Sequence, residues 1–374
     1  MVVRFICSFL AVLMAVMTAA QAQKSAGELC ESDATPADEK IRQCDAWMDE
    51  HPDDPAVQAL GYYRRGNGYA NKRQRAMAIQ NYTRAIELKR DYHQAFNNRG
   101  NQYRALAQYE RAIADYDSAL AIWPDFPMAL VNRGRTYSMQ EQYERAFLDF
   151  DRAIAVAPGF AYAYYERGNA FHSKRQFQRA IQDFNQALQL VPDYVEALDR
   201  RGVAYKNVDD YDRAILDYDR AISLRPKVAA YYYNRGNARY FKDQFDLAIA
   251  DFNRSIELGP SAMALVQRGR CHYAVTRFRE AIADYDEALR LSPNYSIAYF
   301  NRGAAHLRLG EYEAAIFDFD ASLGVEPTYS YSLFGRGVAK RLRGFVTAGN
   351  DDISAAKKIN SKVDQEMAEL KIRP

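Results

Sequence analysis

The side chains best suited to catalysis or metal binding are few in this chain, and they lie far apart. A hydrolytic or zinc site needs histidines at HxxxH spacing, CxxC pairs or a Gly-x-Ser-x-Gly turn, and a phosphate site needs a glycine-rich loop. The 374 residues contain none of these patterns. We therefore predict that the chain is not an enzyme and holds no cofactor and no metal. Its five histidines are His51, His93, His172, His272 and His306.

Arginine and aspartate form a far more regular set. Asn81 or an aspartate follows each of nine arginines, 16 residues later in the chain. A guanidinium fork matches a carboxylate bidentately, so we expect internal pairing, within one repeat or across to the next. The alternative is a row of anion sites. The arginines are Arg65, Arg99, Arg133, Arg167, Arg201, Arg235, Arg268, Arg302 and Arg336, and the aspartates are Asp115, Asp149, Asp183, Asp217, Asp251, Asp284, Asp318 and Asp352.

These arginines belong to a repeat of 34 residues with one step of 33. Each precedes a glycine, an alanine stands 12 residues after most of these glycines, and an aromatic residue follows four positions later. Positions three or four apart share one face of a helix, and proline ends a helix. The pattern predicts helical hairpins that stack because one hairpin cannot bury its apolar face alone. The glycines are Gly66, Gly100, Gly134, Gly168, Gly202, Gly236, Gly269, Gly303 and Gly337.

With stretches such as YYNRGNARY and RAIADYDSAL, the pattern resembles the tetratricopeptide repeat (TPR) family over about residues 59–363. The resemblance implies an all-α fold, an α-solenoid in which nine hairpins stack in a right-handed superhelix. Two departures stand out. Arg239, His272, His306 and Lys340 replace the first-helix aromatic in the last four copies, and Gly349 replaces an alanine in the last copy. His272 and His306 occupy matching places; we interpret them as packing residues, with a metal site as the alternative.

The resemblance also implies a binding site. In such proteins the first helices line a concave groove that holds extended peptides or partner helices, and an asparagine after the glycine bonds the ligand backbone. Basic residues outnumber acidic ones on this surface, which favours a mildly acidic partner; the alternative is that these side chains only solvate an inner face. Six copies have a polar residue after the glycine, and three have an apolar one, Val203, Ala304 or Val338; the polar residues are Asn67, Asn101, Asn169, Asn237, Arg135 and Arg270. Further groove positions are Tyr63, Arg64, Asn97, Tyr165, Arg200, Tyr233 and Arg308.

The N-terminus has the composition of an export signal. Arg4 precedes an almost uninterrupted apolar run from Phe5 to Ala20, and Ala20-Gln21-Ala22 offers small residues for cleavage. We predict a signal peptide and a periplasmic or secreted protein with no stable membrane insertion after cleavage; the alternative is an uncleaved anchor. Export permits disulfides, so we pair Cys30 with Cys44, with two free thiols as the alternative.

Composition restricts the kind of partner. The net charge is +2, from 50 basic and 48 acidic side chains. A nucleic-acid-binding domain usually has a clear basic excess, so we predict that the chain binds no nucleic acid. The leading hypothesis is a non-catalytic adaptor that binds one or more proteins or peptides, and the second is self-assembly into homo-oligomers.

The expected organisation has four parts. They are the signal peptide at 1–22, an N-terminal capping segment at 23–58, the repeats at 59–363 and a C-terminal capping helix at 364–374. The apolar residues of the last part could instead dock into a neighbouring copy. The repeats are expected at 59–92, 93–126, 127–160, 161–194, 195–228, 229–261, 262–295, 296–329 and 330–363.

Overall fold

The computed structural model describes residues 24–373, and all regular secondary structure in that range is helical. This confirms the predicted all-α class, whereas the predicted signal peptide lies outside the described residues. The chain divides into two compact units, Met1–Lys174 and Arg175–Pro374.

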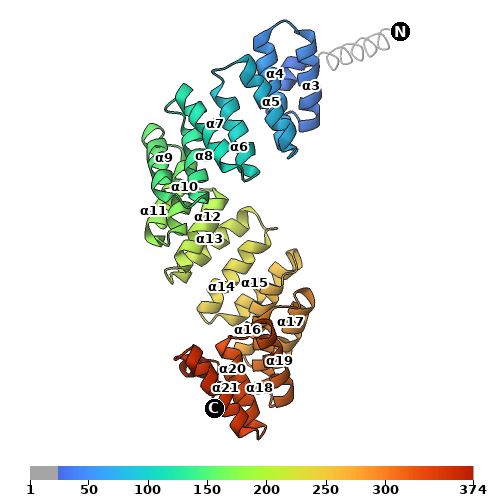
Figure 1. Ribbon diagram of the computed structural model, residues 1–374, viewed down its shortest axis with the longest axis vertical. Coiled ribbons are helices and arrows are strands. Elements are labelled where there is room, and N and C mark those ends of the chain that lie inside the picture. Colours follow the sequence, from blue (N-terminus) through green and yellow to red (C-terminus); the bar gives the residue numbers. More distant parts are fainter. Residues whose placement is uncertain (1–23, 374) are drawn as a thin grey trace, which may run out of the picture. The chain divides into compact units, whose positions relative to one another are not determined.

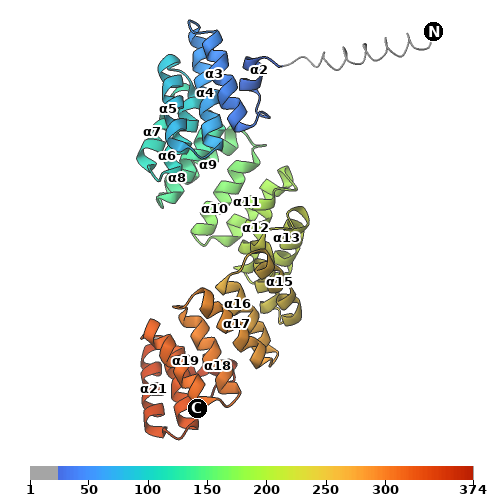
Figure 2. The same cartoon turned by 90° about the vertical axis from the view of Figure 1, so that its right-hand side faces the viewer.

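Within each unit the helices follow one another as antiparallel pairs (Figures 1 and 2). The helices of the first unit are α2 (Ala26–Glu31), α3 (Ala37–Glu50), α4 (Pro55–Asn71), α5 (Arg75–Leu88), α6 (His93–Ala105), α7 (Tyr109–Ile122), α8 (Pro127–Met139), α9 (Tyr143–Val156) and α10 (Ala161–Ser173).

The second unit continues the same alternation. Its helices are α11 (Phe177–Leu190), α12 (Val195–Lys206), α13 (Tyr211–Leu224), α14 (Ala229–Phe241), α15 (Phe245–Leu258), α16 (Ala262–Ala274), α17 (Phe278–Leu291), α18 (Ser296–Arg308), α19 (Tyr312–Val325), α20 (Ser330–Leu342), α21 (Val346–Ile359) and α22 (Val363–Glu369).

The helices that carry the repeat glycines, even-numbered from α4 to α20, are called A helices here, and the odd-numbered helices from α5 to α21 are called B helices. Within a unit, each A helix contacts the B helix that follows it and the B helix of the preceding pair. Neighbouring A helices of a unit also contact one another, as α4 contacts α6 and α16 contacts α18. The A helices of each unit therefore form one continuous face.

The repeat glycine sets the distance between the two helices of a pair. A Cβ atom added to Gly100 would lie 2.8 Å from Cε1 of Tyr116 and 3.1 Å from the backbone oxygen of Ala112. Glycine thus leaves room for the aromatic ring of the B helix, which is fully buried. In the last pair, glycine replaces the usual alanine at position 349 because the helices lie too close for a side chain there. A Cβ added to Gly349 would lie 2.5 Å from the backbone oxygen of Gly337.

The predicted arginine–aspartate pairs form within a repeat. Nε of Arg201 lies 2.9 Å from one carboxylate oxygen of Asp217, and Nη2 lies 2.6 Å from the other. The same bidentate geometry joins Arg99 to Asp115 and Arg302 to Asp318. The aspartates of these pairs are almost completely buried. The arginines are therefore paired inside the protein and do not form a row of open anion sites.

The arginines also connect successive repeats through the nitrogen that the bidentate pair leaves over. Nη1 of Arg133 donates to Asp117 at 2.6 Å, and Nη1 of Arg235 donates to Asp219 at 2.5 Å; both acceptors lie on the preceding B helix. Where that position is amidic, Nη1 of Arg201 donates to Asn185 at 2.7 Å. The expected aspartates are therefore paired within the repeat, and the contact between repeats uses a second set of acceptors on the preceding B helix that the sequence analysis did not single out.

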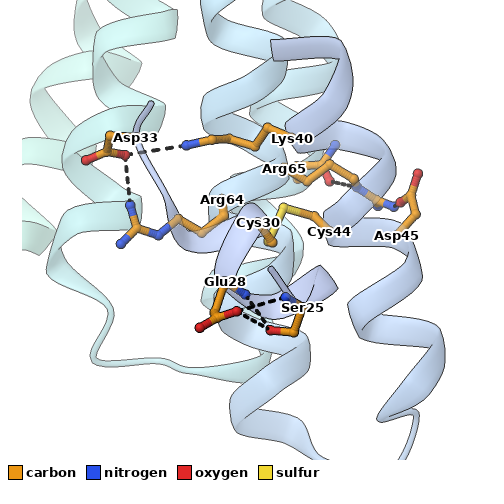
Figure 3. Close-up of a disulfide and its surroundings, with 10 residues drawn as sticks. Ser25, Glu28, Cys30, Asp33, Lys40, Cys44, Asp45, Arg64 and Arg65 are labelled. Carbon is orange, nitrogen blue, oxygen red and sulfur yellow. Dashed lines mark hydrogen bonds and ion pairs between the residues drawn. A yellow bond between two sulfur atoms is a disulfide. The ribbon is translucent and has the colours of Figure 1, made fainter. Parts of the chain in front are cut away.

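The helices α2 and α3 cap the first unit (Figure 3). A disulfide joins Cys30 to Cys44, so that α2 is held against α3. Ser25 and Glu28 form a capping box at the start of α2. The carboxylate of Asp45 on α3 accepts from Nη1 of Arg65, which continues the arginine bridges into the cap.

The C-terminal segment caps the second unit. Val363, Met367 and Ile372 are buried in one cluster with residues of α18, α19, α20 and α21. The hydroxyl of Tyr273, on α16, donates to the backbone oxygen of Leu370 at 2.8 Å. The segment therefore docks on its own chain, over the A helices of the last repeats.

Replacement of Gly100 by alanine tests the close approach of the helices. We expect a loss of about 1–3 kcal/mol in unfolding free energy, because the methyl group meets a ring and a backbone oxygen. Gly324 is the matched control: it lies in α19 with no heavy atom within 4 Å of an added Cβ. Alanine there should stabilise the helix by about 0.5–1 kcal/mol. Thermal unfolding followed by circular dichroism measures both; equal effects would contradict the close approach.

Removal of the carboxylates on either side of Tyr218 in α13, one at a time, separates the two roles of the arginines. Asp217→Ala leaves the half-buried Arg201 without its bidentate partner, and we expect a loss of about 3–5 kcal/mol. Asp219→Ala removes a half-exposed partner of Arg235 and should cost about 0–1 kcal/mol. The melting temperatures of the two variants are compared with that of the wild type. An unchanged melting temperature for Asp217→Ala would show that the buried pair does not stabilise the fold.

Candidate binding surface

The predicted binding residues lie on the A helices, on the face that these helices share within each unit. This surface is called the A-helix face below. In the first unit it has a hollow of about 390 Å³ between α4 and α6, where Asp33 and Lys40 of the cap meet Asn67, Asn98 and Asn101. A second hollow, of about 240 Å³, is lined by α8 and α10 and includes Arg135, Glu166 and Asn169.

Asn67 and Asn101 are held in place by tyrosines of the B helices. The hydroxyl of Tyr82 donates to Oδ1 of Asn67 at 2.8 Å, and the hydroxyl of Tyr116 donates to Oδ1 of Asn101 at 2.9 Å. Nη2 of Arg104 lies 3.3 Å from the same oxygen of Asn101. A guanidinium can only donate, so this contact defines which end of the amide is oxygen. The amide nitrogen of Asn101 therefore stays available as a donor.

Two of the predicted binding residues are not presented to a partner. Asn97 is 3 % exposed and accepts from Nδ2 of Asn132 at 2.9 Å. Asn237 is 6 % exposed and donates to the backbone oxygen of Tyr233 at 3.0 Å. Both amides satisfy buried polar groups inside the unit, so they leave the candidate surface.

The other predicted residues of the first unit have partners in the chain but stay partly exposed. Arg64 pairs with Asp33 at 3.2 Å, beside Tyr63. Nε of Arg135 lies 3.6 Å from Glu166, and Nη1 donates to the hydroxyl of Tyr162 at 3.1 Å. The ring of Tyr165 stacks at 6.3 Å on Tyr162, and Nδ2 of Asn169 donates to Glu166. These residues of α8 and α10 thus form one polar–aromatic group.

In the second unit the predicted residues are spread over three helices. Arg200 on α12 is exposed, and Tyr233 on α14 packs edge-on at 5.9 Å against the ring of Phe252. Arg270 on α16 lines a pocket of about 210 Å³ that also contains Arg308 but neither Arg200 nor Tyr233. The structure does not gather Arg200, Tyr233 and Arg270 into a single site.

The A-helix face changes character where the repeat lacks an asparagine after the glycine. Val203 takes this place in α12, and the buried hydroxyl of Tyr218 has no hydrogen-bond partner among the described residues. Burial raises the pKa of Tyr218. In α18 and α20 the corresponding Ala304 and Val338 are buried in the cluster that includes the C-terminal segment. There the apolar side chains serve as a docking surface for the chain itself.

The basic side chains that replace the first-helix aromatic in the last four copies share a position beside a buried aspartate. Nη1 of Arg239 lies 2.8 Å from Asp251, and Nζ of Lys340 lies 2.8 Å from Asp352. His272 and His306 lie 3.8 Å from Asp284 and Asp318. Each thus approaches the buried aspartate that already pairs with the repeat arginine. Burial acts to raise the pKa of Asp352, but Arg336 and Lys340 together hold it below its ordinary value.

Several residues of these hollows were missed by sequence reasoning. Lys40 and Asp33 come from the cap, and Leu370 comes from the C-terminal segment. All three lie outside the repeats, so the 34-residue period does not predict them. The helical spacing of Val363 and Met367 was the available signal that the C-terminal segment packs against something. It does not say which helices receive it.

Among the described residues, 24–373, no group of three or more His, Cys, Asp and Glu side chains has a metal-binding arrangement. None of the helices described there is long and apolar enough to span a bilayer.

The lone hydroxyl of Tyr218 allows a test of the tyrosine–asparagine contact. Val203→Asn restores the acceptor that Asn67 and Asn101 provide elsewhere, so we expect a stabilisation of about 1 kcal/mol. Thermal unfolding of the double variant Val203→Asn/Tyr218→Phe is the control, since without the hydroxyl the gain should disappear. A gain that persists in the double variant would mean that the asparagine acts in another way.

Comparison with known proteins gives consistent family matches. Three models described as tetratricopeptide repeat match residues 59–92, residues 93–126 and 161–194, and residues 200–263 and 266–325. Together these segments make up more than half of the chain. No curated protein sequence matches it.

Solved structures share the fold. The C-terminal part of a TPR repeat-containing protein from Cytophaga hutchinsonii aligns with a TM-score of 0.51 at 19 % identity, over 64 % of this chain and 98 % of that one. PilF of Pseudomonas aeruginosa aligns with a TM-score of 0.50 at 16 % identity, over 55 % of this chain and 94 % of that one. With its stacked hairpins and the family matches along most of them, this chain belongs to the tetratricopeptide repeat family.

Proposed function

We propose that this protein is a non-catalytic scaffold that binds an extended segment of a partner protein on its A-helix face. The observation that carries the proposal is the polar hollow between α4 and α6, with Asn67 and Asn101 at matching repeat positions. Family membership supports it, because TPR proteins are generally interaction scaffolds.

The chemistry of this hollow suits the backbone of a peptide. The oxygens of Asn67 and Asn101 are occupied by tyrosine hydroxyls, and Nδ2 of each has no acceptor among the described residues. An extended segment presents backbone oxygens that are not used within it, and these can accept from such amides. Asn67 and Asn101 follow each other at one repeat length, so one segment that crosses α4 and α6 can engage both.

The neighbouring group on α8 and α10 adds side-chain recognition. Tyr165 offers an aromatic face, and Asn169 and Arg135 are partly exposed beside it. Tyrosine and arginine are enriched among the residues that dominate binding energies at interfaces. We expect the partner to contact this group with aromatic and polar side chains.

We further propose that the protein works outside the cytoplasm, in the periplasm or after secretion. The apolar N-terminal run motivates this proposal, and the disulfide between Cys30 and Cys44 is compatible with an oxidising compartment. Self-assembly is the weaker candidate. A free C-terminal segment could have joined two copies, but Val363 and Met367 of that segment are buried in their own unit.

A pull-down from the exported fraction tests the proposal, with residues 23–374 as bait and mass spectrometry to identify the partner. A second bait carries Asn101→Ala, Tyr165→Ala and Asn169→Ala. We expect it to lose the partner that the first bait retains, because it lacks donors and the aromatic face of the first unit. A control bait carries Leu148→Ala on α9 and Gln182→Ala on α11, both exposed on B helices.

The three baits separate the possible sites. Capture by the control bait together with loss by the triple variant supports the A-helix face. Equal capture by the wild-type and triple-variant baits would move the site to the B helices or the ends. Capture of the chain alone would favour self-assembly.

A further inference from the structure

The pocket of about 210 Å³ in the second unit is built from three A helices and the C-terminal segment. Tyr240 at the end of α14, Phe245 at the start of α15 and Tyr273 on α16 give it an apolar floor. Leu370 closes one side. The pocket is therefore a depression with aromatic walls, unlike the polar hollow between α4 and α6.

Two arginines at this pocket have no acidic partner. Arg270 and Arg308 form no ion pair with any Asp or Glu among residues 24–373, although Glu369 also lines the pocket. Arg64 and Arg135 of the first unit differ, because Arg64 pairs with Asp33 and Arg135 lies near Glu166. Lys371 offsets the charge of Glu369, so the two arginines leave the pocket positively charged.

Neutral groups hold both arginines in place. Nη2 of Arg270 donates to the hydroxyl of Tyr240 at 3.2 Å, Nη1 donates to Gln267 at 3.0 Å, and the guanidinium lies 4.8 Å from the centre of the Tyr240 ring. The guanidinium of Arg308 lies 5.1 Å from the centre of the Phe278 ring. Such contacts orient a cation without neutralising it. The two charges are positioned in advance of any ligand.

The C-terminal wall of the pocket is also fixed. Tyr273 donates to the backbone oxygen of Leu370, and Met367 and Ile372 on either side of it are buried. The carboxylate of Glu366 accepts from the hydroxyl of Tyr331 at 2.9 Å and from Nδ2 of Asn360 at 2.7 Å. The segment is thus bound at several points, and the pocket remains open beside it.

We propose that this pocket receives an acidic side chain of a partner segment together with an apolar side chain next to it. A carboxylate between Arg270 and Arg308 complements their charge, and an aliphatic or aromatic neighbour covers Tyr240, Phe245 and Leu370. The inference rests on the proposed function, and it names the chemistry that the second unit recognises. A guanidinium pairs with a carboxylate in bidentate fashion, and removal of water from the aromatic floor strengthens the attraction.

A display selection tests this chemistry directly. The probe is a library of random dodecapeptides fused through their C-terminal ends to a coat protein, so that no peptide offers a terminal carboxylate. The targets are residues 23–374 and the same chain with Arg270→Glu and Arg308→Glu. We expect the wild-type chain to enrich peptides in which Asp or Glu adjoins Leu, Ile or Phe. The charge-reversed chain should enrich Lys or Arg beside the same apolar residues.

Single variants then locate the effect. An enriched peptide, resynthesised with an amidated end and a fluorescent label, should bind Arg270→Ala and Arg308→Ala roughly tenfold more weakly in anisotropy titrations. Arg290→Ala, an exposed arginine on the B helix α17 outside the pocket, should leave the affinity unchanged. Circular dichroism and the melting temperature of each variant establish that it is folded.

The outcomes distinguish the pocket from the general function. Peptides that bind the charge-reversed chain as well as the wild type overturn the pocket proposal. If they are lost instead with Asn101→Ala, Tyr165→Ala and Asn169→Ala, the A-helix face still binds partners, but through the first unit. If no peptide is enriched on the wild-type chain while a partner is captured in the pull-down, the pocket proposal fails and the scaffold function stands.

Discussion

The fold depends on one guanidinium per repeat that holds two B helices at once. Nε and Nη2 pair with an aspartate of the same repeat, as in Arg302 and Asp318, and Nη1 reaches the preceding B helix at Asp286. The planar fork fixes both directions simultaneously, which a lysine would not do. The arginine therefore ties together the two helices of a hairpin and also joins that hairpin to the preceding one. The glycine beside it lets the A helix approach closely enough for these bonds to form.

This arrangement explains why the last four copies can do without the first-helix aromatic. In the earlier copies Tyr137 and Tyr205 pack beside the repeat arginine. In the later copies the side chains that approach the aspartate itself are Arg239, His272, His306 and Lys340. Leaving a buried carboxylate without enough polar partners is costly, so a second nitrogen-bearing side chain, which carries a charge in Arg239 and Lys340, can replace apolar packing at this position. The two solutions differ in polarity, but both surround the same carboxylate.

Features that recur with the 34-residue period could be predicted from the sequence, whereas the exposure of individual side chains could not. The hairpins and the arginine–aspartate pairs follow from residue types at fixed spacing, and the structure shows both. Asn97 and Asn237 were expected at the binding face because they occupy groove positions on A helices. Their side chains are buried, because Asn132 and the backbone of α14 offer hydrogen-bond partners inside the unit. Whether an amide faces outward depends on its neighbours in three dimensions, and a repeat position does not record them.

The pocket of the second unit was beyond sequence reasoning for a related reason. Its wall at Leu370 is remote in the chain from Tyr240 and Arg270, and no spacing rule links them. Arg270 and Arg308 were both expected on the groove, but their lack of acidic partners only becomes apparent when every neighbour is placed. The unpaired charge is a property of the assembled surface.

The hydrogen bond from Tyr273 to Leu370 joins residues 97 positions apart, nearly three repeat lengths. In a stack of repeats most contacts are between neighbours, so the end repeat can ordinarily fray alone. Here the end of the chain is tied to α16, and its apolar side chains share a cluster with α18 and α20. Opening α20 and α21 therefore also breaks contacts with the two preceding repeats. The last three repeats form a single cooperative block, whose amide protons should exchange with solvent as a group and not one repeat at a time.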